Sequence, residues 1–480
     1  MTKSRRKERT LFGVPERFMK PRIILVVATV LLVLFGMLMI YSASSVTAMT
    51  NPDMGNSPFY YVKKQAIIAL VGTGIAVFIA VVDYRRICMG WRILFLITLT
   101  MLGVVLLPFA GADALGATRW ISIGGFTIQP SEFAKITIIM MVAFLIQQYL
   151  VDGVLDQRRF FITCAVVVGI PLLLILLQPD KGTTLIIVSA IIIMAFLAGF
   201  DMRFVVLTAI VGAAILLFLA TRDEYSRARF LIGLNPWADY HNTGYQLAQA
   251  QYAFGTGGLF GVGIGFSRQK YSYLPMAHND FIFAVIGEET GFIGILCLFA
   301  VFALVAWAGY QIARYAPDLT GRLVAAGFTS MFIFQALLNV GGVVGALPLT
   351  GKPLPFISYG GSTLLSSLMT VGVLMSISLR SSLPETEHDS RRRSWQIAGE
   401  RIDDSFEEAY GDDYGAGYSA GIGTVRPSSP SASFTMVEGG AKESLRTSRH
   451  RIDLGPSARE RLRSSSDKKR NRNNGRNSRD

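Results

Sequence analysis

The stretch IILVVATVLLVLFGMLMIY, residues 23–41, decides the fold of this chain. A helix needs about 20 mostly apolar residues to cross the roughly 30 Å hydrocarbon core of a bilayer, and this run has that length without one charged residue. It shows no alternation of apolar and polar residues, which barrel strands would require. It is also longer than the apolar part of a cleaved signal peptide, which is the alternative for this position. The stretch therefore predicts a retained transmembrane helix.

Similar apolar runs recur along the chain as far as about residue 380. Of the 480 residues, 51% are hydrophobic and only 16% are charged, and the mean hydropathy is +0.43, which is unusual for a soluble domain. We expect an all-α polytopic membrane protein with about ten transmembrane helices. The predicted spans are 23–41, 66–82, 93–109, 133–150, 160–177, 183–200, 204–221, 292–312, 323–347 and 364–379.

The positions of lysine and arginine predict how these spans are oriented. Basic residues crowd the first twenty positions and then alternate loops, as at Arg85, Arg158 and Arg314, whereas the other loops carry few. Short loops rich in lysine and arginine face the cytoplasm. We therefore expect both termini in the cytoplasm and a large extracytoplasmic loop, about residues 221–281, between the seventh and eighth helices.

The C-terminal part of the chain has a different composition. Residues 381–480 are rich in Ser, Arg, Asp, Glu and Gly, without the apolar periodicity that could build a core, so they are expected to be a disordered cytoplasmic tail. The formal charge of +13 therefore does not indicate nucleic-acid binding. The basic end of the tail either touches anionic lipids or a cytoplasmic partner, or is simply solvated. The predicted organisation is a basic N-terminal segment 1–20, a transmembrane domain 21–380 and the tail.

Asp280 is the leading candidate for a catalytic residue. It stands where the polar loop gives way to FIFAVIG, residues 281–287, so its carboxylate is expected near the outer membrane face. Partial desolvation there would raise its pKa and make it a better base. From the position alone, a helix N-cap is the alternative.

Other polar groups are predicted at the same outer face. Lys270 and other loop cations could hold phosphate oxygens, although most loop cations are only solvated. Glu132 and Lys135 are three residues apart at a helix start and so share a face, where a salt bridge is the structural alternative. Asp180 lies in the short turn QPDKGT, residues 178–183. The three cysteines form no disulfide or zinc pattern and there is no nucleotide P-loop, so no cofactor is expected.

Four separated motifs occur together in order. They are TRWI (118–121) with QPSEFAK (129–135), QPDKGT (178–183), HNDFIFAVIGEETGFIG (278–294) and PLPFISYGGS (353–362). In this combination the chain resembles the SEDS family (shape, elongation, division and sporulation) over about residues 20–380. The resemblance implies a ten-helix fold with a cavity at the outer face. It also implies a peptidoglycan glycosyltransferase that uses lipid II, with a catalytic aspartate that maps onto Asp280.

The resemblance also suggests residues that bind the substrate. These are Lys270, Arg119, Glu132, Lys135, Asp180, Ser358, Gly360 and Gly361. Family members often have an acidic residue and a threonine around the histidine, where this chain has Met276 and Asn279. Met276 removes a candidate metal ligand, so no metal site is predicted and the need for a divalent cation stays open.

Within the family, the sequence favours the division branch, typified by FtsW, over the elongation branch, typified by RodA. The stretches that favour it are FYYVKKQ (59–65) and LNPWADYHNTGYQLAQAQYAF (234–254). Either branch implies a class B penicillin-binding protein as transpeptidase partner, and the division branch implies divisome proteins and a place at the septum of the bacterial cytoplasmic membrane. A lipid II flippase and a scaffold that acts through the tail are the alternatives from other functional classes.

Overall fold

A computed structural model describes most of the chain between residues 10 and 381. The described residues are 10–11, 14–107, 111–114, 117–123, 126–222, 232–233, 235–241, 244–271 and 273–381. The first nine residues and the tail after residue 381 lie outside them, so the predictions for those segments stay predictions.

Long apolar helices dominate the described residues, and each predicted span coincides with one of them. The helices are α1 (Glu16–Thr50), α2 (Tyr60–Val81), α4 (Trp91–Val105), α5 (Pro130–Leu150), α6 (Gln157–Leu177), α7 (Lys181–Ala198), α8 (Met202–Arg222), α11 (Ile282–Arg314), α12 (Leu319–Val344) and α13 (Gly361–Leu379). Eight are long and apolar enough to cross a membrane, while α4 and the apolar part of α8 are shorter. The prediction of an all-α polytopic protein is confirmed, with eight to ten apolar helices.

Every one of these helices begins before its predicted span, and the difference is largest for α1 and α11. Helix α1 starts at Glu16, inside the segment assigned to a basic N-terminal region, and Lys20 of that first turn forms a 2.5 Å ion pair with Glu16. Helix α11 starts ten residues before the predicted span and changes direction at Gly291, whose φ of 67° and ψ of −170° are not helical. The first part of α11, residues 282–290, is an almost fully buried half-helix.

The long loop between α8 and α11 contains structure that hydropathy did not predict. A short 3-10 helix, η2 (Pro236–Asp239), precedes α10 (Tyr245–Gly257), which packs against α11. Between α4 and α5 the chain forms a small antiparallel sheet of β3 (Gly111–Ala114), β4 (Ala117–Ile123) and β5 (Phe126–Ile128), in the order β3-β4-β5. Strand β5 leads into α5, whose first residue is Pro130, a position that suits proline because the missing N–H has no partner there.

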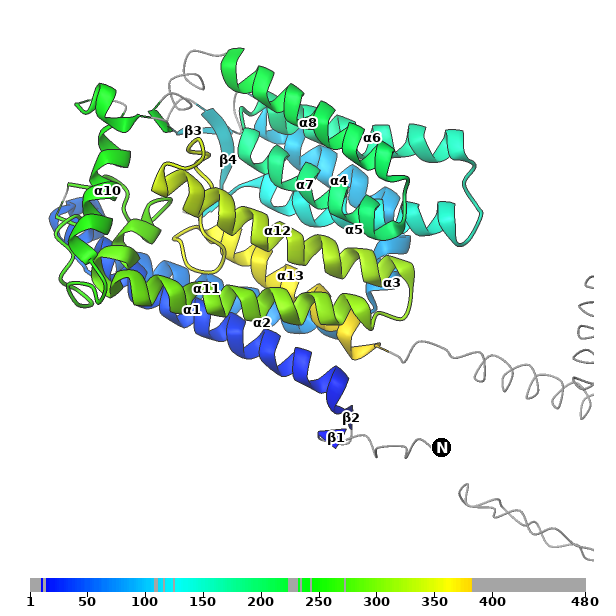
Figure 1. Cartoon of the computed structure of the whole chain (residues 1–480), viewed down its shortest axis with the longest axis horizontal. Coiled ribbons are helices and arrows are strands. Elements are labelled where there is room, and N and C mark those ends of the chain that lie inside the picture. The colour runs from blue at the N-terminus through cyan, green and yellow to red at the C-terminus, as the bar shows by residue number, and fades with distance from the viewer. Residues whose placement is uncertain are drawn as a thin grey trace, which may run out of the picture. The chain divides into compact units, whose positions relative to one another are not determined.

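The long helices run side by side with alternating direction, so their ends gather at two ends of the bundle (Figure 1). We call the end where α5, α7, α11 and α13 begin the loop end, and the end where α1 begins and α13 stops the terminal end. Helix α12 is central, since it packs against α5, α7 and α11 and most of it is buried. The outer helices expose large apolar side chains, such as Leu70 and Phe78 of α2, which suits contact with lipid.

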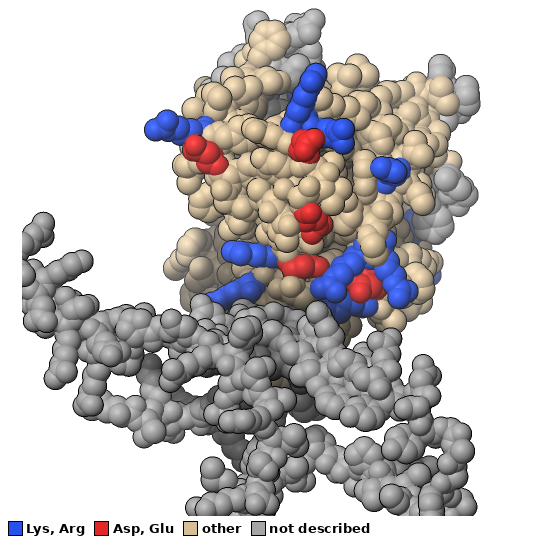
Figure 2. All heavy atoms as spheres, turned by 90° about the vertical axis from the view of Figure 1, so that its right-hand side faces the viewer, with Lys and Arg blue, Asp and Glu red and all other residues tan. Residues whose placement is uncertain are grey.

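The terminal end carries many of the charged side chains. Figure 2 views this end and shows lysine and arginine side chains gathered there among a few acidic ones. Two ion pairs join separate elements: Arg85 of α3 (Tyr84–Met89) lies 2.6 Å from Asp318 before α12, and Arg380 lies 3.3 Å from Asp83. These contacts join α12 and α13 to the short helix α3.

A short antiparallel hairpin precedes α1. Its two strands are β1 (Thr10–Leu11) and β2 (Val14–Pro15).

Candidate functional site

Asp280 lies at the loop end, directly before the buried half-helix of α11. The N-cap position of α11 is Phe281, one residue after it. The backbone carbonyl of Asp280 accepts a 2.8 Å hydrogen bond from Nδ2 of Asn339, a buried residue of α12. The same Nδ2 donates a second 2.8 Å bond to the carbonyl of Lys352. One side chain of the central helix therefore fixes the backbone at Asp280 relative to the segment before α13.

Asp180 and Lys352 form a buried ion pair beside this point. Nζ of Lys352 lies 2.8 Å from both carboxylate oxygens of Asp180, and both side chains are almost fully buried. The carboxylate also caps α7, because it accepts bonds from the backbone N–H of Thr183 at 3.2 Å and from its hydroxyl at 2.8 Å. Ser131 at the start of α5 donates a further 2.8 Å bond. Asp180 thus joins the starts of α5 and α7 to the segment before α13.

The charge state of Asp180 follows from these partners. Burial alone would raise the pKa of its carboxyl, but the nearby cations of Lys352 and Arg119 and the bonds from Lys352 and Thr183 hold that pKa well below its usual range. The Asp180 carboxyl is therefore ionised at neutral pH.

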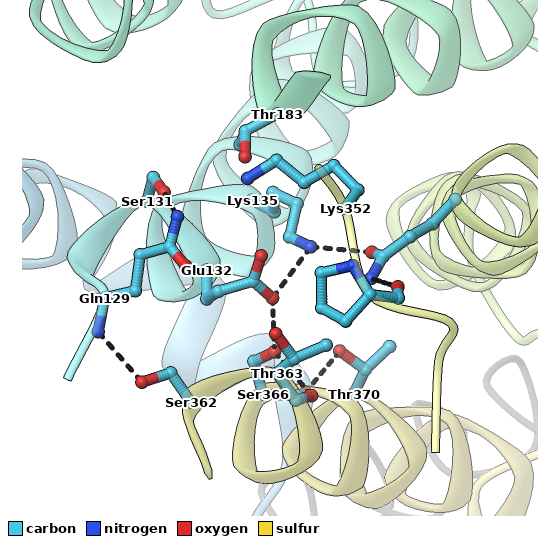
Figure 3. A network of polar contacts seen from close by, with 12 residues as sticks. Gln129, Ser131, Glu132, Lys135, Thr183, Lys352, Ser362, Thr363, Ser366 and Thr370 are labelled. Carbon is cyan, nitrogen blue, oxygen red and sulfur yellow. Dashed lines mark hydrogen bonds and ion pairs between the residues drawn. The ribbon is translucent and has the colours of Figure 1, made fainter. Parts of the chain in front are cut away.

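Glu132 and Lys135 form a second buried ion pair one turn into α5, as Figure 3 shows. Their charged atoms are 2.9 Å apart. Nζ of Lys135 also donates a 2.8 Å bond to Oε1 of Gln335 in α12, and Ser366 of α13 donates a 3.2 Å bond to Glu132. The prediction that Glu132 and Lys135 share a helix face is confirmed. Three helices meet at this pair.

Arg119 approaches the same region from strand β4. Its Nε donates a 2.9 Å bond to the carbonyl of Gln178, and Nη2 donates a 2.6 Å bond to the carbonyl of Pro179. These two carbonyls immediately precede Asp180, so the guanidinium holds the turn between α6 and α7. Arg119 is only partly buried, unlike Lys352.

An aromatic group surrounds His278 near Asp280. The ring of His278 lies 4.3 Å from the ring centre of Tyr61 in α2 and 5.7 Å from that of Tyr359. The backbone N–H of Tyr359 donates a 2.9 Å bond to the carbonyl of His278. Burial lowers the pKa of His278 to about 4, so the imidazole is neutral at physiological pH.

The predicted substrate-binding residues of the PLPFISYGGS motif lie at the start of α13 or in the turn just before it. The hydroxyl of Ser358 accepts a 2.8 Å bond from the N–H of Leu354, which closes a tight turn before α13. Gly360 is the N-cap residue of α13. A Cβ at Gly361 would lie 2.7 Å from the side chain of Ile68 in α2, so this glycine lets α2 and α13 approach closely.

Lys270 lies in a separate buried cluster around the half-helix of α11. Its ammonium bonds to the carbonyl of Gly265 and lies 3.8 Å from Glu289, whose carboxylate accepts a 2.5 Å bond from Ser42 of α1. The neighbouring Glu288 accepts bonds from the backbone N–H groups of Arg268 and Gln269 at 3.0 and 3.4 Å. The glutamates therefore hold the glycine-rich loop against α11, which explains how carboxylates are accommodated at the start of a span.

The structure therefore brings Arg119, Glu132, Lys135, Asp180 and Asp280 to the loop end through shared partners, whereas Lys270 belongs to the neighbouring cluster around Glu289. Sequence reasoning missed Asn339 and Gln335. A usable signal was present, because a glutamine and an asparagine four residues apart inside the apolar span share one helix face.

The electrostatics of this end suit an anionic ligand. Helices α5, α7, α11 and α13 all begin here, and helix N-termini carry partial positive charge. Arg119, Lys135 and Lys352 add cationic side chains, although the last two are paired with carboxylates. Among the described residues, no three His, Cys, Asp or Glu side chains gather as they would around a metal ion.

Comparisons with known proteins agree with this architecture. A family model described as "Cell cycle protein", for FtsW, RodA and SpoVE, matches residues 22–383. Stage V sporulation protein E of Bacillus subtilis is 40% identical over 359 residues, which cover 75% of this chain and 97% of that protein. A probable peptidoglycan glycosyltransferase FtsW of Trichlorobacter lovleyi is 40% identical over 383 residues, which cover 78% of this chain and 98% of that protein.

A solved structure has the same fold. It is a chain from a peptidoglycan synthase complex that coordinates polymerization and crosslinking, with 26% identity and a TM-score of 0.60. The match covers 74% of this chain and 96% of that chain. The chain therefore belongs to the SEDS family, the cell cycle proteins that include FtsW, RodA and SpoVE.

Proposed function

We propose that the chain is a peptidoglycan glycosyltransferase that joins lipid II disaccharide units into glycan strands, with Asp280 as the catalytic base. The observation that carries this proposal is the position of Asp280. Its backbone is fixed by Asn339 at the loop end, beside the buried pair of Asp180 and Lys352. The name of the FtsW relative, 40% identical over most of both chains, supports the same activity.

We propose that all ten apolar helices cross the bacterial cytoplasmic membrane, with both termini in the cytoplasm. The terminal end would then be cytoplasmic, in agreement with the lysine and arginine side chains gathered on it (Figure 2). The loop end would face outward, where a lipid-linked sugar carried by the outer leaflet would reach Asp280.

The proposed reaction is a single displacement. The 4-hydroxyl of the acceptor N-acetylglucosamine attacks the anomeric carbon of the donor N-acetylmuramic acid. Asp280 takes the proton of that hydroxyl as the new oxygen–carbon bond forms. The bond between the anomeric carbon and the phosphate oxygen breaks, and the pyrophosphate leaves with its lipid. One base on the attacking side predicts inversion at that carbon.

The developing charge on the leaving pyrophosphate needs stabilisation. We assign this role to Arg119 and Lys352, together with the N-termini of α5 and α7, which their bonds hold in place. Ser358, Gly360 and Gly361 would bind substrate through the turn that they shape before α13. For Lys270 we propose a contribution through the position of its loop, because its ammonium already contacts Gly265 and Glu289.

We further propose that the chain acts in septal wall synthesis, together with divisome proteins and a class B penicillin-binding protein as transpeptidase. The similar fold of a chain from a peptidoglycan synthase complex supports a partnered polymerase. Polymerisation for cell elongation is the alternative. Depletion of the protein in its host separates them, since filaments with no septa support division and rounded cells support elongation.

The test of the activity uses purified protein with its transpeptidase partner, in detergent, with lipid II. Asp280→Asn keeps the shape of the side chain and removes the base, so glycan synthesis should fall by about 100-fold or more. The matched control is Asp201→Asn at the terminal end, where the carboxylate accepts a 2.9 Å bond from the N–H of Arg203. This control should polymerise at the parental rate.

Two outcomes would overturn the proposal. Unchanged synthesis by Asp280→Asn would remove Asp280 as the base. Detergent micelles have no second leaflet, so the detergent assay scores polymerisation alone. If the parent protein made no glycan in that assay but moved lipid II across vesicle membranes, it would be a flippase.

A further inference from the structure

The glycine-rich loop after α10 exposes an unbroken set of large apolar side chains. Its segment LFGVGIGF, residues 259–266, has only glycines besides these apolar residues. The exposed fractions are 63% for Leu259, 79% for Phe260, 40% for Val262, 51% for Ile264 and 74% for Phe266. No charged residue lies within the segment. We call it the apolar loop.

The apolar loop lies against the protein at Gly261. Gly261, Gly263 and Gly265 have φ values of 80°, 103° and 88°, which strongly favour glycine. A Cβ on Gly261 would lie 2.2 Å from the carbonyl oxygen of Glu289. The backbone therefore lies against α11 at Gly261, while the apolar side chains of the segment are exposed.

The backbone donors of the apolar loop are largely satisfied by the protein. The N–H groups of Val262 and Gly263 donate to the carbonyls of Glu288 and Glu289 at 2.9 and 3.0 Å, and that of Gly261 donates to Gly257 at 2.8 Å. Non-helical backbone is tolerated at membrane depth only where its polar groups are paired within the protein or face water. This loop meets the first of these conditions at those positions.

The distance along helix α1 gives the depth of the apolar loop relative to the bilayer. Arg22, at the terminal end, donates to Ser378 near the end of α13, and Ser42 lies twenty residues farther along α1. At ~1.5 Å per residue, Ser42 is about 30 Å from Arg22, which is about the thickness of the hydrocarbon core. Ser42 bonds to Glu289, whose carbonyl binds Gly263. The apolar loop therefore lies near the boundary of the hydrocarbon.

The apolar loop is continuous with the exposed face of α11. The N–H groups of Phe292 and Ile293, just beyond the kink, donate to the carbonyls of Gly258 and Leu259 at 3.0 and 3.1 Å. Phe292, Ile293 and Leu296 are all exposed, in a helix long and apolar enough to span a membrane. Lipid that covers this face of α11 meets the apolar loop next.

The residues that follow the apolar loop are of types that suit the membrane–water interface. Tyr271 and Tyr273 are exposed, and tyrosine is enriched at that level of a bilayer. Arg268 is exposed, whereas the ammonium of Lys270 points inward to Gly265 and Glu289. Arg268 is therefore placed to meet lipid phosphates.

We propose that residues 259–266 insert their side chains into the lipid leaflet at the loop end and anchor the loop that leads to Asp280. The occupant of this surface is the bilayer itself, because the loop continues the lipid-facing side of α11 at the same depth. The anchor would keep the segment between α10 and α11 at the level of the lipid head groups.

The test measures the depth of single spin labels in the full chain, reconstituted in vesicles of phosphatidylethanolamine and phosphatidylglycerol. Labels at F260C and F266C are placed in a C164A/C297A background that keeps the buried Cys88. The references are L296C on the exposed side of α11 and D152C in the exposed turn between α5 and α6. Labels at 260 and 266 should show an oxygen-to-nickel collision ratio several-fold above D152C and close to L296C. Collision ratios equal to that of D152C would mean that the side chains at 260 and 266 face water, or a surface that a protein partner covers, and would overturn the proposal.

A second measurement keeps all native cysteines, in case the altered background fails to fold. F260W and F266W replace one ring with another, and brominated phospholipids quench tryptophan that lies among acyl chains. The added emission, taken as the difference from the parent, should be quenched in both variants and unquenched in the matched variant D152W. Equal quenching in all three, or none at 260 and 266, would contradict insertion.

Discussion

Asn339, buried near the loop end of α12, donates a 2.8 Å hydrogen bond to the backbone carbonyl of Asp280. Its second bond, also 2.8 Å, reaches the carbonyl of Lys352, whose side chain pairs with Asp180. A single amide group therefore sets the distance between the proposed base and the proposed leaving-group site.

Asn339→Ala should lower both activity and stability. The two carbonyls lose their donor, which costs about 1–3 kcal/mol of unfolding free energy for each buried group left unsatisfied. Displacement of the base by about 1 Å can cost up to about 100-fold in rate. The loss should appear in the turnover number more than in KM, measured by glycan synthesis from lipid II beside a thermal melt.

The matched control for Asn339 is Thr320→Ala at the other end of α12. It removes the 2.9 Å bond from the Thr320 hydroxyl to Oε1 of Gln147, keeps the 2.8 Å bond from the backbone N–H, and does not touch the loop end. It should melt earlier and polymerise normally once folded. If Thr320→Ala and Asn339→Ala lost activity in proportion to their melting temperatures alone, a positioning role for Asn339 would be excluded.

Lys352→Met should destabilise the protein strongly. It leaves the carboxylate of Asp180 buried without its main counter-charge, and breaking a buried pair in this way costs about 3–5 kcal/mol. The double variant Asp180→Asn with Lys352→Met removes both charges and should recover much of that loss. Melting curves for the parent, the two single variants Asp180→Asn and Lys352→Met, and the double variant in the same detergent give the coupling energy.

Activity of the double variant distinguishes structure from substrate contact. Recovered stability with activity still reduced by 10-fold or more, about 1.4 kcal/mol, would assign the pair to the substrate. Full recovery of both would reduce Asp180 and Lys352 to a structural pair and would remove Lys352 from the proposed mechanism.

His278 should make stability fall between pH 6.5 and 4. Burial lowers its pKa to about 4, whereas the unfolded chain has about 6.5, so the unfolded state binds more protons in that window. The free energy of unfolding therefore decreases as the pH falls, by on the order of 3 kcal/mol across the window. Asp180, whose pKa is depressed, contributes stability that is lost below about pH 4, outside this range.

His278→Gln isolates this effect. The variant loses ring contacts with Tyr61 and Tyr359 and should be less stable at every pH, but its stability should change less between pH 6.5 and 4.5 than that of the parent. Melting temperatures measured every half unit of pH give the two slopes. Parallel slopes would show that His278 titrates normally in the folded protein.

Sequence reasoning succeeded where a property is local. A long apolar run such as residues 23–41 needs no partner to be recognised as a span, and the three-residue spacing of Glu132 and Lys135 predicts their shared face. Sequence reasoning did not find the first part of α11, because Glu288 and Glu289 interrupt the apolar run there. Their charges are compensated by groups about twenty residues earlier, which no local pattern reveals.

The dependence on contacts between distant parts of the chain also explains why the sequence did not reveal the partners of the site residues. Lys270 and Lys352 are both loop lysines in the sequence, yet one folds onto Glu289 and the other onto Asp180. Only the packing of helices distant in the chain distinguishes them. Asn339 was visible as a polar residue inside a span, but its target, a backbone carbonyl, carries no mark in the sequence.

Gly261→Ala should be the most damaging of three glycine substitutions around the apolar loop. It combines a φ of 80° with a Cβ that would lie 2.2 Å from a backbone oxygen. Gly265→Ala has a φ of 88° but no atom within 4 Å of the new Cβ, so only the backbone strain of about 1–2 kcal/mol applies. Gly255→Ala lies inside α10 with nothing within 4 Å, and should leave stability unchanged or raise it by up to about 1 kcal/mol.

The order of melting temperatures tests how closely the loop approaches α11. Gly255→Ala should melt at or above the parent, Gly265→Ala below it, and Gly261→Ala lowest, with glycan synthesis lost in that last variant because the loop that carries Lys270 and leads to Asp280 is pushed away. Equal losses for Gly261→Ala and Gly265→Ala would mean that backbone strain alone acts and that the loop does not lie against Glu289. A normal melt for Gly261→Ala would contradict the packing on which the membrane anchor depends.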